Sequence, residues 1–193
     1  MTLGRVEQAL ASYRFRERPD ADPERWASVA AILRDDPADG PSVLVIRRSE
    51  HPSDPWSGHM AMPGGRKDPG DPTPRHAAER EALEEVGIDL CRHGRFLGRL
   101  DDVVAVARGL RIGLTIAPFV YVLEQSVEPV LKVDEVQEAL WVPLRDLHGP
   151  THRGTRSYEI AGTTVLLPCW RWNDRIIWGL TYNMLESLLR LAG

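Results

Sequence analysis

The segment 64–88 constrains the chain more than any other part, because it joins a glycine pair and a loop to a strongly signalled helix. Thr73 followed by Pro74 is typical of a helix start, with a hydroxyl N-cap and proline at the first helical position. Gly87 is typical of a helix end, because glycine tolerates left-handed dihedral angles. We therefore predict a helix from Pro74 to about Val86.

Three glutamates lie on one face of this predicted helix. Glu81, Glu84 and Glu85 have the spacing of neighbours on a helix surface, so their charges repel one another. Arg80, four residues before Glu84, is one cation that offsets this repulsion. A divalent metal is another, since Mg²⁺ favours oxygen ligands and binds substrate phosphates. An acidic helix face is most often a solvated surface, so the glutamates alone would not indicate a site.

The rest of the chain alternates short apolar segments with turn-rich ones. Strands are expected at 28–33, 42–48, 59–62, 94–106, 112–123 and 139–142, with hairpins between residues 158 and 178. A helix is expected near the N-terminus, from the spacing of Val6, Leu10 and Tyr13. Another is expected from Thr181 to Ala192, where apolar residues recur at core-facing positions. This is a mixed α+β pattern.

Composition narrows the class of protein further. The 193 residues suit a single domain over 1–193, with an N-terminal helix and loop over 1–25 and a core over 28–189. The net charge of −4 gives no support to a nucleic-acid partner. The longest uncharged apolar run, 112–123, is too short to cross a bilayer. Two widely separated cysteines and a charged N-terminus lead us to expect a cytoplasmic protein with reduced thiols.

The whole segment from the glycine pair to the end of the helix resembles the Nudix box. That pattern is a glycine, five residues, a glutamate, seven residues, then Arg-Glu-apolar-x-Glu-Glu-x-Gly-apolar. Its second half is matched at every fixed position, by Arg80, Glu81, Ala82, Glu84, Glu85, Gly87 and Ile88. The first half departs, because Gly65 lies fifteen residues before Arg80, one more than in the pattern. Asp71 is the nearest acid to the missing glutamate; it either substitutes for that residue or helps to cap the helix.

The resemblance implies a Nudix-like α/β/α sandwich, with a mixed β-sheet between helices. It implies that Mg²⁺ or Mn²⁺ is bound by Glu81, Glu84, Glu85 and the backbone carbonyl of Gly65. It further implies that Arg80 orders the acidic cluster and acts with Glu84 in catalysis.

Residues outside the acidic helix complete the expected site. Nudix enzymes often recruit a further acid from a loop outside the box, and Glu135 is the candidate here, with Asp134 and Glu138 behind it. For any one of them a solvated loop acid is the commoner role. Candidate phosphate-binding cations are Arg47, Arg48, Arg66 and Lys67, since arginine offers a forked donor to phosphate oxygens.

The longer spacing and Asp71 resemble the coenzyme A pyrophosphatase-like branch of the family. Asp134-Glu135-Val136 and the Met62-Pro63-Gly64-Gly65 turn agree with this branch, although its phenylalanine before Pro-Gly-Gly is Met62 here. A second departure is Asp54, which stands where the branch has an arginine four residues before Gly58. The implied activity is metal-dependent hydrolysis of a pyrophosphate linkage, with coenzyme A or acyl-CoA as the leading substrate.

Other substrates and roles remain open from the sequence. ADP-ribose, NADH, nucleotide sugars and capped RNA are alternative substrates, and a nucleotide-sensing module without catalysis is an alternative role. The intact glutamates favour an enzyme. The expected partner is a small nucleotide pyrophosphate, with no nucleic acid and no membrane; a homodimer is left open.

Overall fold

The computed structural model describes residues 1–18, 22, 25–52, 54, 56–107, 110–160 and 162–193. In this part of the chain eight strands form one mixed sheet. They are β1 (Trp26–Asp36), β2 (Gly40–Arg48), β3 (Met60–Ala61), β4 (Gly64–Arg66), β5 (Gly94–Arg99), β6 (Val103–Ala107), β7 (Leu110–Leu123) and β8 (Val136–Pro143). The long β1 pairs in parallel with β7 and antiparallel with β2 and β4, so the predicted mixed sheet is confirmed.

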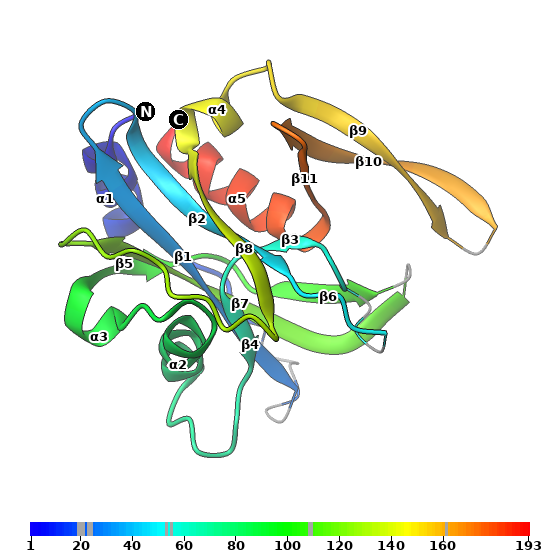
Figure 1. Cartoon of the computed structure of the whole chain (residues 1–193), viewed down its shortest axis with the longest axis horizontal. Coiled ribbons are helices and arrows are strands. Elements are labelled where there is room, and N and C mark those ends of the chain that lie inside the picture. The colour runs from blue at the N-terminus through cyan, green and yellow to red at the C-terminus, as the bar shows by residue number, and fades with distance from the viewer. Residues whose placement is uncertain (19–21, 23–24, 53, 55, 108–109, 161) are drawn as a thin grey trace.

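Helices cover both faces of this sheet (Figure 1). The helix α2 (Pro74–Val86) packs on one face, followed by the short α3 (Leu90–His93). The other face carries α1 (Leu3–Ser12), α4 (Leu144–His148) and α5 (Gly179–Ala192). Successive side chains of a strand point to opposite faces, and β1 divides its residues accordingly. Ala30 and Ile32 join the α2 side, whereas Ala31 and Leu33 join the α5 side.

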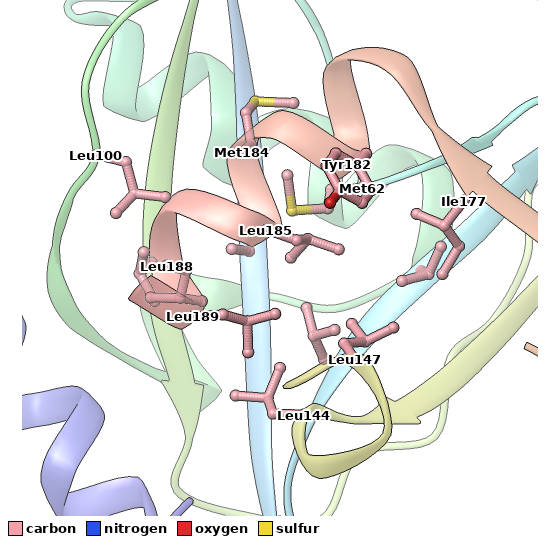
Figure 2. Packing of buried hydrophobic residues seen from close by; sticks show 14 of the residues in the cluster. Met62, Leu100, Leu144, Leu147, Ile177, Tyr182, Met184, Leu185, Leu188 and Leu189 are labelled. Carbon is pink, nitrogen blue, oxygen red and sulfur yellow. The ribbon is translucent and has the colours of Figure 1, made fainter. Parts of the chain in front are cut away.

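The α5 side holds the larger apolar core (Figure 2). Leu185, Leu188 and Leu189 of α5 are almost fully buried. They belong to the same cluster as Leu144 and Leu147 of α4. Burying a leucine side chain contributes roughly 1.5–3 kcal/mol, so these contacts hold the C-terminal helix firmly against the sheet.

The ends of α2 are those that the sequence predicts. The side-chain oxygen of Thr73 accepts a hydrogen bond from the backbone N–H of His76, and Pro74 is the first helical residue. Gly87 ends the helix with φ of 67°. A Cβ atom at Gly87 would lie 2.9 Å from the Cβ atom of Val130, so contact with a distant segment adds to the preference for glycine.

The prediction of one continuous strand at 94–106 is wrong, because its antiparallel pairing with β7 is interrupted between Arg99 of β5 and Val103 of β6. The carboxylates of Asp101 and Asp102 are engaged at this point by the segment that follows α1. Asp101 accepts hydrogen bonds from the Tyr13 hydroxyl at 2.5 Å and from the backbone N–H of Arg16 at 2.8 Å. Asp102 accepts one from the backbone N–H of Arg18 at 2.9 Å. These contacts lie next to Leu100, whose backbone N–H still donates to the carbonyl oxygen of Pro118 in β7 at 3.0 Å.

A second, three-stranded antiparallel sheet lies among the described C-terminal residues. It consists of β9 (Arg153–Ile160), β10 (Thr163–Trp172) and β11 (Arg175–Trp178). The predicted turn at Asn173 and Asp174 joins β10 to β11, with Asn173 at φ of 52°. The β9–β10 hairpin projects from the body of the molecule (Figure 1). Within the described residues, each helix is too short or too polar to cross a bilayer.

Candidate active site

The Pro-Gly-Gly turn brings the backbone against both the central sheet and α2. A Cβ atom on Gly64 would lie 2.3 Å from the carbonyl oxygen of Ser28 in β1. A Cβ atom on Gly65 would lie 2.3 Å from Oε1 of Glu81. Any larger residue would therefore displace its neighbours, which explains the need for two glycines. The turn places backbone groups directly beside the acidic face of the helix.

Arg80 connects the glutamates of α2 with the loop before the helix. Its Nη1 donates to Oε1 of Glu81 at 2.9 Å and to Oε2 of Glu84 at 3.1 Å. Its Nη2 donates to the carbonyl oxygen of Arg66 at 3.0 Å and to Oδ2 of Asp71 at 3.1 Å. The pairing of Arg80 with Glu84 that the sequence suggests is present. The hydrogen bond with Asp71 and the charge of Glu81 raise the pKa of the guanidinium, which links three carboxylates.

Asp71 pairs with Arg80 and does not cap the helix. Its side chain is buried, and Oδ2 also accepts the backbone N–H of Asp68 at 2.8 Å. Burial raises the pKa of Asp71, but the hydrogen bonds from Arg80 and Asp68 lower it by more. The cap is supplied by Thr73. Asp71 therefore contributes to the site through the arginine.

Glu85 is a buried carboxylate, with 3% of its surface exposed. Its Oε2 accepts the backbone N–H of Gly64 at 2.8 Å, and Nη1 of Arg48 lies 4.0 Å from its Oε1. Burial raises the pKa of Glu85 to about 7; the charge of Glu81 adds to this shift and the Gly64 hydrogen bond opposes it. Burial also raises the pKa of Glu81, against the effect of Arg80. A buried carboxylate with so little positive charge near it indicates a place for a cation.

A cleft of about 780 Å³ opens beside α2. Its volume is within the range of small-molecule sites, about 300–1,000 Å³. One end is lined by carboxylates, two arginines and the glycine turn. Its residues are Arg48, Gly64, Gly65, Arg66, Glu81, Glu85, Asp134 and Glu135. Glu84 is not among the described residues that line the cleft; its side chain is 44% exposed and reaches Arg80 instead.

Glu135 lies on the segment that leads into β8 and lines the acidic end of the cleft. The Nζ atom of Lys132 lies 2.8 Å from its Oε1. The charge of Glu135 raises the pKa of both Glu81 and Glu85, so the three carboxylates share one region. Glu138 is separate, because its two carboxylate oxygens each accept a hydrogen bond of 2.6 Å from Arg175.

The expected phosphate-binding cations are placed differently from one another. Arg66 lines the cleft, whereas Arg47 and Lys67 are not among the described residues that do. Nη2 of Arg47 lies 3.7 Å from Oε1 of Glu50. Arg48, the fourth candidate, lines the cleft as Arg66 does. Neighbours on a strand point to opposite faces, and the β2–β8 register shifts between these two arginines.

The orientation of Arg48 depends on an ion pair with Asp54, which the sequence does not predict. Oδ2 of Asp54 accepts hydrogen bonds from Nε of Arg48 at 2.9 Å and from Nη2 at 2.8 Å. Asp54 is the residue that departs from the coenzyme A branch, and here it holds a cation at the cleft. No local signal in the sequence reveals this contact, because it depends on the path of the loop after β2.

His59 also lines the cleft and contacts Trp178, with ring centroids 4.9 Å apart and ring planes inclined at 60°. Burial lowers the pKa of His59, and the nearby charge of Arg156 acts in the same direction. This shift favours the uncharged imidazole, which lines the cleft beside Trp178.

The acidic residues have the chemistry of a site for a hard divalent cation. Among the described residues, no cluster of three or more acidic, histidine or cysteine side chains is gathered around one point, because Glu81 and Glu84 both contact Arg80. The donors themselves are carboxylate oxygens, which Mg²⁺ and Mn²⁺ favour. The incompletely compensated charge of Glu85 supports the same conclusion. These residues fit a divalent cation, provided that Glu81 turns from Arg80 to meet it.

A family model described as the NUDIX domain matches residues 24–160, which is more than half of the chain. The chain therefore belongs to the Nudix family, and the predicted family is confirmed. Members of this family generally use divalent metal ions. The match includes the glycine turn, α2 and the segment of Glu135.

Curated relatives agree with this assignment. An uncharacterized protein of Schizosaccharomyces pombe is 39% identical over 157 residues, which cover 72% of this chain and 47% of the relative. The peroxisomal coenzyme A diphosphatase ndx-8 of Caenorhabditis elegans is 34% identical over 137 residues, covering 68% of this chain and 54% of that protein. The predicted likeness to the coenzyme A branch is thus confirmed. The chain spans about half the length of these relatives.

Solved structures show the same fold. A NUDIX hydrolase from Alicyclobacillus acidocaldarius has a TM-score of 0.55 at 19% identity, covering 90% of this chain and 94% of that chain. An Ap4A hydrolase complex from Caenorhabditis elegans has a TM-score of 0.53 at 23% identity, covering 63% and 82%. The predicted α/β/α sandwich is confirmed.

Proposed function

We propose that this protein is a divalent-metal-dependent hydrolase that cleaves the pyrophosphate linkage of coenzyme A or an acyl-CoA. The observation that carries the proposal is the acidic end of the cleft. Glu81, Glu85 and Glu135 line that end together with Gly65, and the carboxylate of Glu85 is buried with little compensating positive charge. A site that only bound an anionic phosphate, without a metal ion, would not be lined by several carboxylates.

The residues would divide the work of hydrolysis between them. Glu81, Glu84 and Glu85, with the carbonyl of Gly65, would hold Mg²⁺ or Mn²⁺. When bound, such a metal neutralises pyrophosphate charge and lowers the pKa of a coordinated water. Glu135 is the candidate to accept the proton of the attacking water.

Cations of the cleft would position the phosphates. Arg48 and Arg66 both line the acidic end, and arginine donates two parallel hydrogen bonds to phosphate oxygens. The water oxygen forms a bond to one phosphorus while the bond from that phosphorus to the bridging oxygen breaks. For coenzyme A the products are an adenosine bisphosphate and phosphopantetheine. Arg47 and Lys67 lie outside the cleft lining and would act only on the approach of an anion.

The substrate is proposed from similarity and from the shape of the cleft. The relative named a coenzyme A diphosphatase supports coenzyme A over ADP-ribose, NADH or a nucleotide sugar. A nucleotide-sensing module is a second candidate, but retention of all three helix glutamates favours an enzyme. The proposal also includes a small-molecule partner, with no nucleic acid or membrane, and a cytoplasmic location. Both cysteines, Cys91 and Cys169, are free, as expected of a reducing compartment.

Release of phosphorylated products tests the proposal. Purified protein is incubated with coenzyme A, acetyl-CoA, ADP-ribose, NADH, a nucleotide sugar and capped RNA, with and without Mg²⁺. We expect metal-dependent cleavage of the coenzyme A compounds, lost in Glu84→Gln. Turnover of another compound would show that coenzyme A is not the substrate, while supporting the proposed pyrophosphate hydrolysis. Saturable nucleotide binding without turnover would favour the sensing module.

A further inference from the structure

Ser28 carries a buried hydroxyl that has no hydrogen-bond partner in the described part of the chain. The residue lies in β1 and is fully buried. Its Oγ atom neither donates nor accepts a hydrogen bond among the described residues. Most buried hydroxyls in proteins are paired, and an unpaired one destabilises the fold. The surroundings of Ser28 therefore need to explain why a hydroxyl is present there.

The side chain of Ser28 points toward α2. Alternate residues of a strand share a face, and Ala30 and Ile32 of β1 pack on the α2 side. Ser28 is two residues before Ala30, so it faces the same way. It is also paired with Gly65 of β4. Directly paired residues of antiparallel strands share a face, with Cβ positions about 4.5–5.5 Å apart. Ser28 thus lies beside the space that a side chain at Gly65 would fill.

The carboxylate of Glu81 occupies that space. A Cβ atom on Gly65 would lie 2.3 Å from Oε1 of Glu81 and 2.9 Å from Oε2. The hydroxyl of Ser28 and the carboxylate of Glu81 are therefore neighbours over the same pair of strands. They are not hydrogen-bonded in this structure, where Oε1 accepts from Nη1 of Arg80 at 2.9 Å.

We propose that Ser28 is a positioning residue of the metal site, whose hydroxyl donates a hydrogen bond to the carboxylate of Glu81 when this carboxylate is released by Arg80. A carboxylate that binds a metal is oriented by hydrogen bonds from neighbouring groups, and a hydroxyl is a strong donor to it. The inference rests on the proposed metal-dependent hydrolysis and adds a residue of β1 to its site.

The test is the dissociation constant for Mn²⁺, measured without substrate from the EPR signal of free Mn²⁺. Ser28→Ala removes the hydroxyl with little change of volume. Loss of a group that orients a metal ligand weakens metal binding by about 10–100-fold, so the Kd of this variant should rise by about 10-fold or more. Ser42→Ala is the matched control. Ser42 is buried in β2, pairs with Pro143 and is not among the described residues that line the cleft. Its loss should leave the Kd unchanged.

Thermal unfolding gives a second readout. Because the hydroxyl of Ser28 is unpaired without metal, Ser28→Ala should raise the Tm of the metal-free protein by about 2 °C or more. At one fixed concentration of Mn²⁺ the Tm of Ser28→Ala should rise by less than that of the wild type. Higher stability without metal, combined with weaker metal binding, is not expected of a residue that only supports the fold.

Ser28→Cys is a second variant for the case that Ser28→Ala does not fold. The thiol is close to the hydroxyl in size but is a weaker donor. Its sulfur is also a poor ligand for a hard cation such as Mn²⁺. The Kd should therefore rise in Ser28→Cys as well, by a smaller factor than in Ser28→Ala.

Four results would overturn the inference, and they differ in what else they affect. Equal Kd values for the wild type and the Ser28 variants would remove the role of Ser28 while leaving the metal site and the proposed hydrolysis intact. Equal rises in Ser28→Ala and Ser42→Ala would mean that loss of any buried hydroxyl has this effect. A lower metal-free Tm of Ser28→Ala would show that the hydroxyl is already paired in the fold. Absence of Mn²⁺ binding by the wild type would overturn the inference together with the proposed metal dependence.

Discussion

Glu81 holds its carboxylate in the space that a side chain of residue 65 would occupy, since a Cβ atom on Gly65 would lie 2.3 Å from Glu81 Oε1. Gly65→Ala should therefore displace this carboxylate without unfolding the sheet. A misplacement of about 1 Å can cost roughly 100-fold in rate, and we expect a loss of that order in kcat. Gly70→Ala is the control, because among the described residues no atom lies within 4 Å of its added Cβ. Equal activity of the two variants would contradict this role of Gly65.

The second prediction concerns the cost of the buried charge on Glu85. Glu85→Gln removes that charge but keeps an oxygen that accepts the Gly64 N–H. The metal-free variant should be more stable than the metal-free wild type, by about 1–2 kcal/mol, or roughly 2–8 °C in Tm. Added Mg²⁺ should raise the Tm of the wild type only. Thermal unfolding with and without Mg²⁺ measures both effects, and destabilisation of the metal-free variant would show that Glu85 is a structural group.

Substitution of Asp71 is predicted to lower the catalytic rate, whereas substitution of Thr73 is predicted to lower the stability of the fold. Asp71→Asn removes a charge that holds Arg80, so kcat should fall by about 10-fold or more while KM changes little. Thr73→Ala removes the N-cap of α2 and should cost about 1 kcal/mol of unfolding free energy with kcat retained. Steady-state kinetics and denaturant unfolding of both variants separate the two roles. Asp71→Glu, which keeps the charge, should retain more activity than Asp71→Asn.

Acid should weaken the attachment of the segment that follows α1. Hydrogen bonds from Tyr13 and Arg16 lower the pKa of Asp101 below its usual 3.8, against the effect of burial. A lowered carboxyl pKa contributes stability above the usual value, and this contribution is lost as pH falls through the folded-state pKa. Asp101→Asn should therefore be less stable than the wild type by about 1 kcal/mol at pH 7. The difference should shrink below about pH 4; a pH-independent difference would contradict the assignment.

Local signals in the sequence were enough to predict the acidic helix. Thr73, Pro74 and Gly87 set its ends by capping and backbone preference, which depend on few neighbours. The spacing of the glutamates then placed their side chains on one helix face, and Arg80 was correctly expected to contact Glu84. The family resemblance supplied the sandwich fold around this helix.

Contacts between distant segments were not predictable in the same way. Arg47 and Arg48 look equivalent in the sequence, and a register shift in the β2–β8 pairing decides which of them reaches the cleft. Asp54 pairs with Arg48 only because the loop returns to the strand. The place of Leu167 in the lining of the cleft likewise depends on where the second sheet lies. These features follow from tertiary packing, which periodicity does not encode.

Hydrolysis in ¹⁸O-labelled water tests the central claim most directly. Wild type and Glu85→Gln are incubated with octanoyl-CoA and Mg²⁺, and the products are identified by mass spectrometry. We predict that the wild type forms an adenosine bisphosphate and an acylated phosphopantetheine, with one ¹⁸O atom in the phosphate of one product. Neither product should form without metal or in Glu85→Gln. Release of free fatty acid, or cleavage that is independent of metal and of Glu85, would contradict the account.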